Sequence, residues 1–189
     1  MRTIDLWEGK WRLKTMNVLF PPRIVQNLLT LPEPENLPEK PRSVYLHGDT
    51  ESGKTIYACQ LLLHFAKLNY LHPTDDLYRS CFMPETQLFQ EVKKTYDKKS
   101  EKTESEILAY YQKQDILVID DLGRNRVTPW FHEILYIIIN YRYEYLLPTI
   151  ITSNYDLPRL SEMLEDDRIP SRIVRMGDVI EKIPWNGKQ

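Results

Sequence analysis

The stretch from Gly48 to Thr55 combines glycine, lysine and threonine in a spacing that suits phosphate. It reads GDTESGKT and places two of the six glycines five residues apart, with Lys54 and Thr55 at its end. Glycine lets backbone N–H groups turn toward an anion where side chains would clash. An apolar run precedes the stretch and a helical pattern follows it, so a helix N-terminus would add its positive dipole end. We predict that this loop binds a nucleotide through eight residues: Gly48, Asp49, Thr50, Glu51, Ser52, Gly53, Lys54 and Thr55.

The paired acids of LVIDDLG are the expected second half of the site. In this arrangement Lys54 would reach the β- and γ-phosphates, and the Thr55 hydroxyl would ligate Mg²⁺. Asp120 would hold Mg²⁺ through its water shell, and Asp121 would orient or deprotonate an attacking water. A strand-end acid can also simply cap the next segment. The pair nevertheless favours water as the acceptor, and therefore hydrolysis.

A polar run, TSN, ends a further apolar segment at Asn154. In a parallel sheet the carboxyl ends of the strands line the ligand crevice. Asn154 is thus a candidate to hydrogen-bond both the γ-phosphate and the water, and the alternative is a turn-forming asparagine.

The segment DDRIPSRIVRM contains three arginines within a span of eight residues. An arginine that faces the γ-phosphate stabilises charge in the transition state. The alternative is a solvated basic turn that pairs with Asp166 and Asp167. The candidates are Arg168, Arg172 and Arg175.

Apolar runs and helical patterns alternate along the chain after residue 42, which predicts an α/β fold with a parallel sheet and helices on both faces. We expect strands at residues 43–48, 79–84, 115–120, 149–154 and 178–183. We expect helices at residues 54–69, 85–96 and 129–146, with shorter helical stretches ending near residue 112 and around residues 160–164 and 171–176. Prolines disfavour regular structure at residues 31–41, which we interpret as a linker. Residues 1–41 would then be an extension and linker, a candidate partner-binding segment, and residues 42–189 the nucleotide-binding domain.

Composition limits the class of protein. Of the 189 residues, 42% are hydrophobic. The net charge is −2, so no overall positive field draws the chain to nucleic acid. Cys59 and Cys81 are too few for a disulfide framework, and no apolar run is long enough to span a bilayer. Because the first twenty residues carry charges and tryptophans throughout, we do not expect them to form a signal peptide. We expect a cytoplasmic protein that does not contact a membrane.

These motifs, in this order, resemble the AAA+ ATPases, and within them the bacterial helicase-loader and transposition-helper proteins of the DnaC/IstB type. The resemblance extends over residues 43–183, and its most specific parts are LVIDDLG, INYRYEYLLPTIITSNYDLPRL and RIPSRIVRMGDVIEKI. It implies a P-loop core of five strands with the loop strand in the centre, ATP and Mg²⁺ as cofactors, and Asn154 as the residue called sensor 1. It also implies that Arg172 reaches the ATP of a neighbouring subunit, with Arg168 and Arg175 as lesser candidates.

The same resemblance implies partners. Such proteins assemble head to tail as rings or open spirals, act with a replicative helicase and grip single-stranded DNA. Candidate DNA contacts are Lys98, Lys99, Arg124 and Arg126, although acids accompany the lysines. The helical lid of larger relatives is expected to be absent or minimal. The source would be a bacterial cell, with a phage or mobile element as a further possibility.

Three functions stay open at this stage. The first is an ATPase that loads a replicative helicase, and the second is a helper that regulates a transposase on target DNA. The third, from a different class, is a stand-alone nucleotide-binding regulator or a small-molecule kinase.

Overall fold

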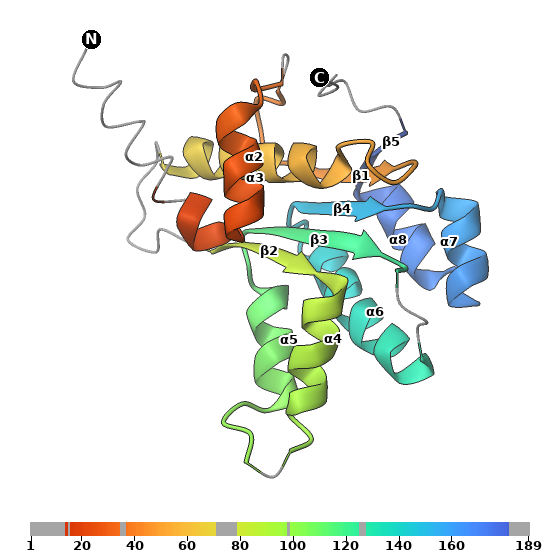
Figure 1. The fold of residues 1–189 in the computed structure, drawn as a ribbon. Coiled ribbons are helices and arrows are strands. Elements are labelled where there is room, and N and C mark those ends of the chain that lie inside the picture. Colours follow the sequence, from red (N-terminus) through yellow and green to blue (C-terminus); the bar gives the residue numbers. More distant parts are fainter. Residues whose placement is uncertain are drawn as a thin grey trace.

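Five short strands of alternating apolar side chains form one parallel sheet. The computed structural model describes residues 14, 16–34, 37–70, 79–97, 99–124 and 128–181. The strands are β1 (Ser43–His47), β2 (Ser80–Pro84), β3 (Ile116–Leu122), β4 (Thr149–Ser153) and β5 (Gly177–Ile180). Their order is β2-β3-β4-β1-β5, and every pairing is parallel (Figure 1). The predicted five-stranded α/β fold is therefore confirmed.

The expectation that the loop strand lies in the centre is wrong. The central strand is β4, whose five residues are all buried, whereas β1 lies between β4 and the short edge strand β5. The ends of β1, Ser43 and His47, are only half-buried. Strands β3 and β1 also have a neighbour on each edge, but only β4, the segment TIITS, has two strands on each side, and all five of its residues are buried.

The helices of the described residues lie close to the predicted positions. They are α2 (Pro22–Thr30), α3 (Lys54–Tyr70), α4 (Glu85–Lys94), α5 (Glu104–Gln112), α6 (Pro129–Glu144), α7 (Leu157–Leu164) and α8 (Arg168–Met176). Thr128 caps α6 by accepting from the Phe131 N–H, and Pro129 occupies the first helical position. Helix α2 was not predicted, although Pro22 in its first turn is a start signal.

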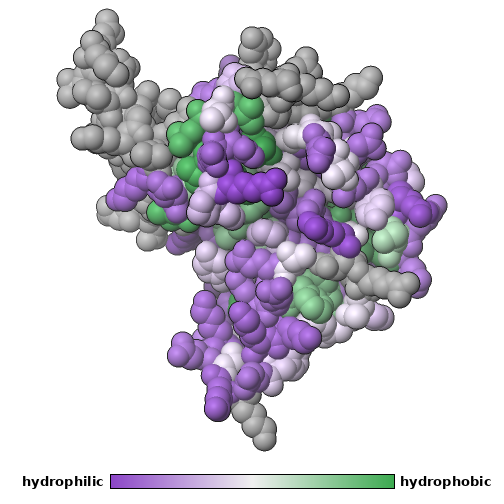
Figure 2. All heavy atoms as spheres, viewed as in Figure 1, coloured by the Kyte–Doolittle hydropathy of each residue, from purple (hydrophilic) through white to green (hydrophobic). Residues whose placement is uncertain are grey.

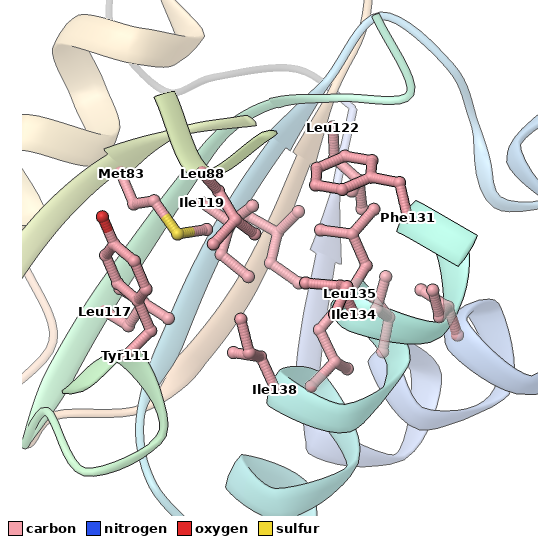
Figure 3. Close-up of a cluster of buried hydrophobic side chains, with 14 of the residues drawn as sticks. Met83, Leu88, Tyr111, Leu117, Ile119, Leu122, Phe131, Ile134, Leu135 and Ile138 are labelled. Carbon is pink, nitrogen blue, oxygen red and sulfur yellow. The ribbon is translucent and has the colours of Figure 1, made fainter. Parts of the chain in front are cut away.

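Alternate residues of each strand feed two separate cores. Val44, Leu46 and Ile150 pack under α2 and α3 on one face. Tyr45 and Ile151, their neighbours in sequence, pack on the other face against helices α4 to α8. Figure 3 shows part of this second core, where strand residues such as Met83 and Ile119 meet Leu135 and Ile138 of α6. The period of two in the strands thus gives the sheet two apolar faces.

Part of the N-terminal extension belongs to the first core. Met16 is fully buried, and Phe20 packs edge-on against Phe82 of β2 with ring centroids 5.7 Å apart. Phe20 thus packs on this chain itself. The other large apolar residues of the extension, Trp7, Trp11 and Leu13, lie outside the described residues. The His64 ring is 2.8 Å from the Pro38 carbonyl and ties the proline-rich segment to α3.

Helices α4 and α5 form a hairpin that projects from the body of the sheet (Figure 1). Figure 2 shows that the visible surface of this projection is largely hydrophilic. Thr103 and Glu106 form a reciprocal capping box at the start of α5, which fixes where the loop between the two helices ends.

Candidate functional site

The phosphate loop joins β1 to α3 and is closed around its own lysine. Lys54 is only 5% exposed, and its ammonium donates to the carbonyls of Gly48 at 2.9 Å and Asp49 at 2.6 Å, and to Ser52 Oγ at 3.2 Å. Gly48 and Gly53 have φ of 137° and 87°, values that side chains rarely allow. The loop therefore has the backbone that the glycine spacing predicted.

The charge on Lys54 is costly in this position. Burial lowers its pKa, while the nearby carboxylates of Asp121, Asp120 and Asp49 raise it. A phosphate oxygen could replace the backbone carbonyls that now accept from this ammonium at the start of α3, because a charge-assisted hydrogen bond to phosphate is stronger.

Asp120 on β3 contacts both the start of α3 and the end of β4. Its Oδ1 accepts from Thr55 Oγ1 at 2.8 Å and from Thr152 Oγ1 at 2.7 Å. Burial raises the pKa of this carboxyl, and the two hydroxyl donors oppose that effect. The sequence prediction that Thr55 and Asp120 come together is matched by their contact, and Thr152 was not foreseen as their partner.

Asp121 lies beside this pair in a strained backbone conformation. Its φ is 60°, in the left-handed region, and its N–H donates to Thr152 Oγ1 at 2.9 Å. Its carboxylate oxygen Oδ2 accepts from Arg124 at 2.9 Å. Arg124, a predicted DNA contact, thus lies next to the paired acids.

Asn154 directly follows β4 and is exposed. The register pairs His47 with Ser153, so Asn154 comes level with Gly48 at the carboxyl edge of the sheet. The turn that carries it is fixed on both sides. Ser153 Oγ donates to the Leu122 carbonyl at 2.7 Å and accepts from the Tyr155 N–H at 3.1 Å. Asn154 is therefore held at the edge where the loop begins.

Arg172 lies on the surface formed by α6 and α8. Its Nε donates to Asn140 Oδ1 at 3.0 Å, and its guanidinium carbon lies 5.7 Å from the Tyr136 ring centroid and 5.6 Å from that of Tyr143. Both rings belong to α6. This aromatic cradle orients Arg172 along α6, on the opposite face of the sheet from α3.

The other two arginines differ from Arg172. Arg168 pairs with Asp166 at 2.6 Å and with Glu133 at 3.2 Å, and it stacks 4.4 Å above the Tyr136 ring. Arg168 thus pairs with Asp166, as in the alternative interpretation of this segment as a basic turn paired with its neighbouring acids. Arg175 is exposed in the last turn of α8.

Two of the four predicted DNA contacts, Lys99 and Arg124, lie among the described residues, on different loops. Lys99 is exposed on the loop between α4 and α5, and Lys98 and Arg126 lie outside the described residues. Four lysines and three acids line a hollow of about 720 Å³ at this hairpin tip: Lys93, Lys94, Lys99, Lys102, Glu91, Asp97 and Glu101. The mixed charges keep the local field weak.

A magnesium ion would find oxygen ligands at Thr55 and Asp120. Mg²⁺ keeps several waters and takes only one or two protein ligands when phosphates supply the rest, and a buried carboxylate with an adjacent hydroxyl fits that demand. In the part of the chain that the structure describes, no group of three His, Cys, Asp or Glu side chains could hold a metal by itself. None of the described helices is long and apolar enough to cross a membrane.

Comparisons with solved structures give the same core. The chain matches the crystal structure of the DnaC helicase loader with a TM-score of 0.62 and 24% identity, covering 85% of this chain and 86% of that one. It matches the crystal structure of DnaI with a TM-score of 0.58 and 26% identity, covering 85% and 79%. It also matches the replication initiator DnaA bound to AMPPCP and single-stranded DNA, with a TM-score of 0.58 and 21% identity over 85% of this chain and 44% of that chain. The predicted resemblance to helicase loaders is confirmed at the level of the fold.

The family comparison covers the elements that build the site. A search of curated proteins by sequence finds no significant match. The family model described as RNA helicase matches residues 44–154, which is more than half of the chain. This range runs from β1 through the phosphate loop and the paired acids to Asn154. The chain therefore belongs to the RNA helicase family of P-loop proteins, and its core has the AAA+ fold of the loaders DnaC and DnaI.

Proposed function

We propose that this protein binds and hydrolyses ATP and uses the nucleotide to load a replicative helicase on single-stranded DNA. The observation that carries the ATP part is the shared oxygen of Asp120, which receives hydroxyl hydrogen bonds from Thr55 and Thr152. This network brings the phosphate loop, the first acid and β4 to one point. The loader part rests on the likeness to the DnaC helicase loader over most of both chains.

Binding begins with an exchange of partners at Lys54. The ammonium releases the carbonyls of Gly48 and Asp49 and takes phosphate oxygens, which relieves the cost of its burial. The α3 N-terminus adds its dipole to the same phosphates. Thr55 and Asp120 would hold a magnesium ion, which would neutralise charge on the phosphates.

Hydrolysis uses the side chains at the carboxyl edge of the sheet. Asp121 orients the attacking water and accepts its hydrogen bond, and Asn154 holds the water against the γ-phosphate from the turn after β4. Rigid anchoring of that turn by Ser153 favours a single water position.

The site is completed by a second copy of the chain. Arg172 is oriented by α6 and not by its own phosphate loop, so it acts on the ATP of the neighbouring subunit. Each subunit then gives one arginine and receives one, which produces a ring or an open spiral. We place the protein in the cytoplasm, with the α4–α5 hairpin, including Lys99, facing single-stranded DNA.

The binding step is tested with Lys54→Ala and fluorescent ATP. Loss of a buried, charge-assisted contact should weaken binding by roughly 10- to 100-fold. Lys94→Ala is the matched control because Lys94 is exposed on α4, and its affinity should equal that of the wild type. Equal affinity of Lys54→Ala and the wild type would remove the phosphate loop from the nucleotide site.

The loader step is tested on a closed circle of single-stranded DNA, onto which a ring-shaped helicase cannot thread. ATP and the protein should raise the amount of helicase recovered on the circle, and Lys54→Ala should not. A protein that binds a transposase and leaves helicase recovery unchanged would be a transposition helper. A rate of ATP hydrolysis that is independent of protein concentration and of DNA would favour a stand-alone nucleotide-binding regulator.

A further inference from the structure

A buried carboxylate holds the turn that follows the paired acids. Glu85 is the first residue of α4 and is fully buried. Its Oε2 accepts from the N–H of Gly123 at 2.6 Å and from the N–H of Arg124 at 3.1 Å. Two successive N–H groups that converge on one oxygen form a backbone nest, which favours a negative charge. Glu85 therefore fixes the backbone at residues 123–124 from a different strand–helix junction.

The turn cannot easily take another shape. Gly123 has φ of 86°, and a Cβ there would lie 3.1 Å from Leu160 and 3.2 Å from Tyr155. The Arg124 N–H also donates to the Asp121 carbonyl at 3.1 Å. These contacts direct the Arg124 side chain back along the turn, where its guanidinium meets Asp121 Oδ2 at 2.9 Å.

The two carboxylates of this arrangement differ in accessibility. Glu85 is sealed in the protein, whereas the Arg124 side chain is 64% exposed and that of Asp121 is 30% exposed. An exposed ion pair is weak and exchanges readily with solvent. The hydrogen bonds of Glu85 to the Gly123 and Arg124 N–H groups thus stay closed in the folded protein. The ion pair between Arg124 and Asp121 can open.

Occupation of Asp121 by a guanidinium opposes its use in catalysis. A carboxylate that accepts from a water must offer a free oxygen lone pair and its negative charge. The guanidinium binds Oδ2, and its positive charge offsets part of the negative charge of the carboxylate. The closed ion pair therefore makes Asp121 a weaker acceptor for the water than it is when Arg124 has moved away.

We propose that Arg124 restrains Asp121 and that Glu85 is the positioning residue that aims Arg124. The inference rests on the proposed role of Asp121 in hydrolysis and adds a regulation of that residue. Opening an exposed ion pair corresponds to about a two- to fivefold change in rate. Arg124 therefore lowers the turnover number and leaves nucleotide affinity unchanged.

The test measures kcat, KM and nucleotide Kd for Arg124→Ala and Arg124→Gln. We expect kcat to rise about two- to fivefold in both variants, with Kd unchanged. Arg159→Ala is the matched control, because Arg159 forms an exposed ion pair with Glu162 three residues along α7. Its kcat should not move. A kcat of Arg124→Ala equal to or below that of the wild type overturns the restraint.

The role of Glu85 is tested in combination. In a Glu85→Leu background the turn loses its acceptor, and Arg124→Ala should no longer change kcat. Glu85→Gln keeps a carbonyl oxygen at this position and should retain the effect of Arg124→Ala. It also serves where the leucine variant does not fold. Hydrogen exchange at the Gly123 and Arg124 amides should be faster than wild type in Glu85→Leu and close to wild type in Glu85→Gln.

The outcomes separate this inference from the proposed function. An Asp121→Asn variant that hydrolyses ATP like the wild type overturns the role of Asp121 itself. Measurable wild-type turnover that depends on Asp121, with no response to Arg124→Ala, overturns only the restraint. An effect of Arg124→Ala that persists unchanged in Glu85→Leu overturns the positioning by Glu85.

Discussion

Thr152 on β4 donates its hydroxyl to Asp120 Oδ1 at 2.7 Å and, with the same oxygen, accepts the Asp121 N–H at 2.9 Å. One buried side chain thus serves both acids of the pair. The contact links the central strand to the end of β3 at the point where the register between them shifts.

Thr152→Val keeps the shape of this side chain and removes both contacts. Because the hydroxyl is one of two donors that oppose the raised pKa of Asp120, its loss should raise that pKa further. We expect the acidic limb of the pH–rate profile to move to higher pH, and turnover at neutral pH to fall. Thr95→Val, which loses one hydroxyl contact to Val92 on α4, should keep the wild-type profile. An unchanged profile in Thr152→Val would exclude this role.

Asp120→Asn should stabilise the nucleotide-free protein at neutral pH. Burial raises the folded-state pKa of Asp120 above its ordinary value of 3.8. The folded protein therefore gains stability from this group at low pH and loses it as the pH rises through the folded-state pKa. The amide carries no charge, so Tm at pH 7 should rise by about 2–4 °C. The rise should disappear below pH 3.8.

The same variant should lose the stabilisation that Mg-ATP gives the wild type. Thermal unfolding with and without Mg-ATP at two pH values measures both effects. A lower Tm of Asp120→Asn at pH 7 without nucleotide would contradict the assignment of a charged, buried carboxylate.

Two inactive variants should restore each other if Arg172 acts in trans. Lys54→Ala should bind nucleotide weakly but present Arg172, and Arg172→Ala should bind nucleotide but lack the arginine. An arginine finger contributes roughly 10³–10⁵ in rate, so each variant alone should be nearly inactive. Their mixture should hydrolyse ATP at a rate that follows the number of mixed interfaces. Steady-state ATPase at several mixing ratios measures this.

Arg175→Ala provides the comparison for that experiment, since Arg175 is the exposed arginine one turn along the same helix. It should remain active. Normal hydrolysis by Arg172→Ala, in isolation and in complex with DNA and helicase, would show that the finger is a different residue.

Arg142 should be a main determinant of stability. It is fully buried in α6, and burial lowers its pKa to about 10. Its guanidinium donates to Thr149 Oγ1 and to the carbonyls of Tyr111, Gln112, Gln114 and Pro148. Arg142→Met removes this donor from all five acceptors and should lower the free energy of unfolding by about 3 kcal/mol. Denaturant unfolding measures the change, and Arg159→Met on the surface of α7 should lie within about 0.5 kcal/mol of the wild type.

The sequence predicted local features of the fold better than distant ones. The turn at Gly48–Thr55 and the buried strand before Asp120 depend on residues that are near each other in sequence. The prediction of β1 in the centre failed because strand order depends on which edges pair, and no short-range pattern encodes that. Helix α2 was missed because prolines suggested only a linker, although Pro22 stands where a helix begins.

The missed site residues share one property. Thr152, Glu85 and Arg142 are polar residues that are buried by partners about 30 or more residues away, except for the Thr149 and Pro148 contacts of Arg142. In the sequence Glu85 resembles an ordinary acid in the first turn of a helix. A buried charge is recognised only when the groups that satisfy it are seen together.

The alternation of the strands between two cores has a consequence for how such a chain can diverge. Val44 and Ile150 face α3, and Tyr45 and Ile151 face α6 and its neighbours. Substitutions at every second strand position can therefore remodel the side that carries Arg172 while the side that carries α3 keeps its packing. The sheet separates the α3 face from the face that carries Arg172, so the residues of the subunit contact and those of the nucleotide site can evolve at separate rates within one small domain.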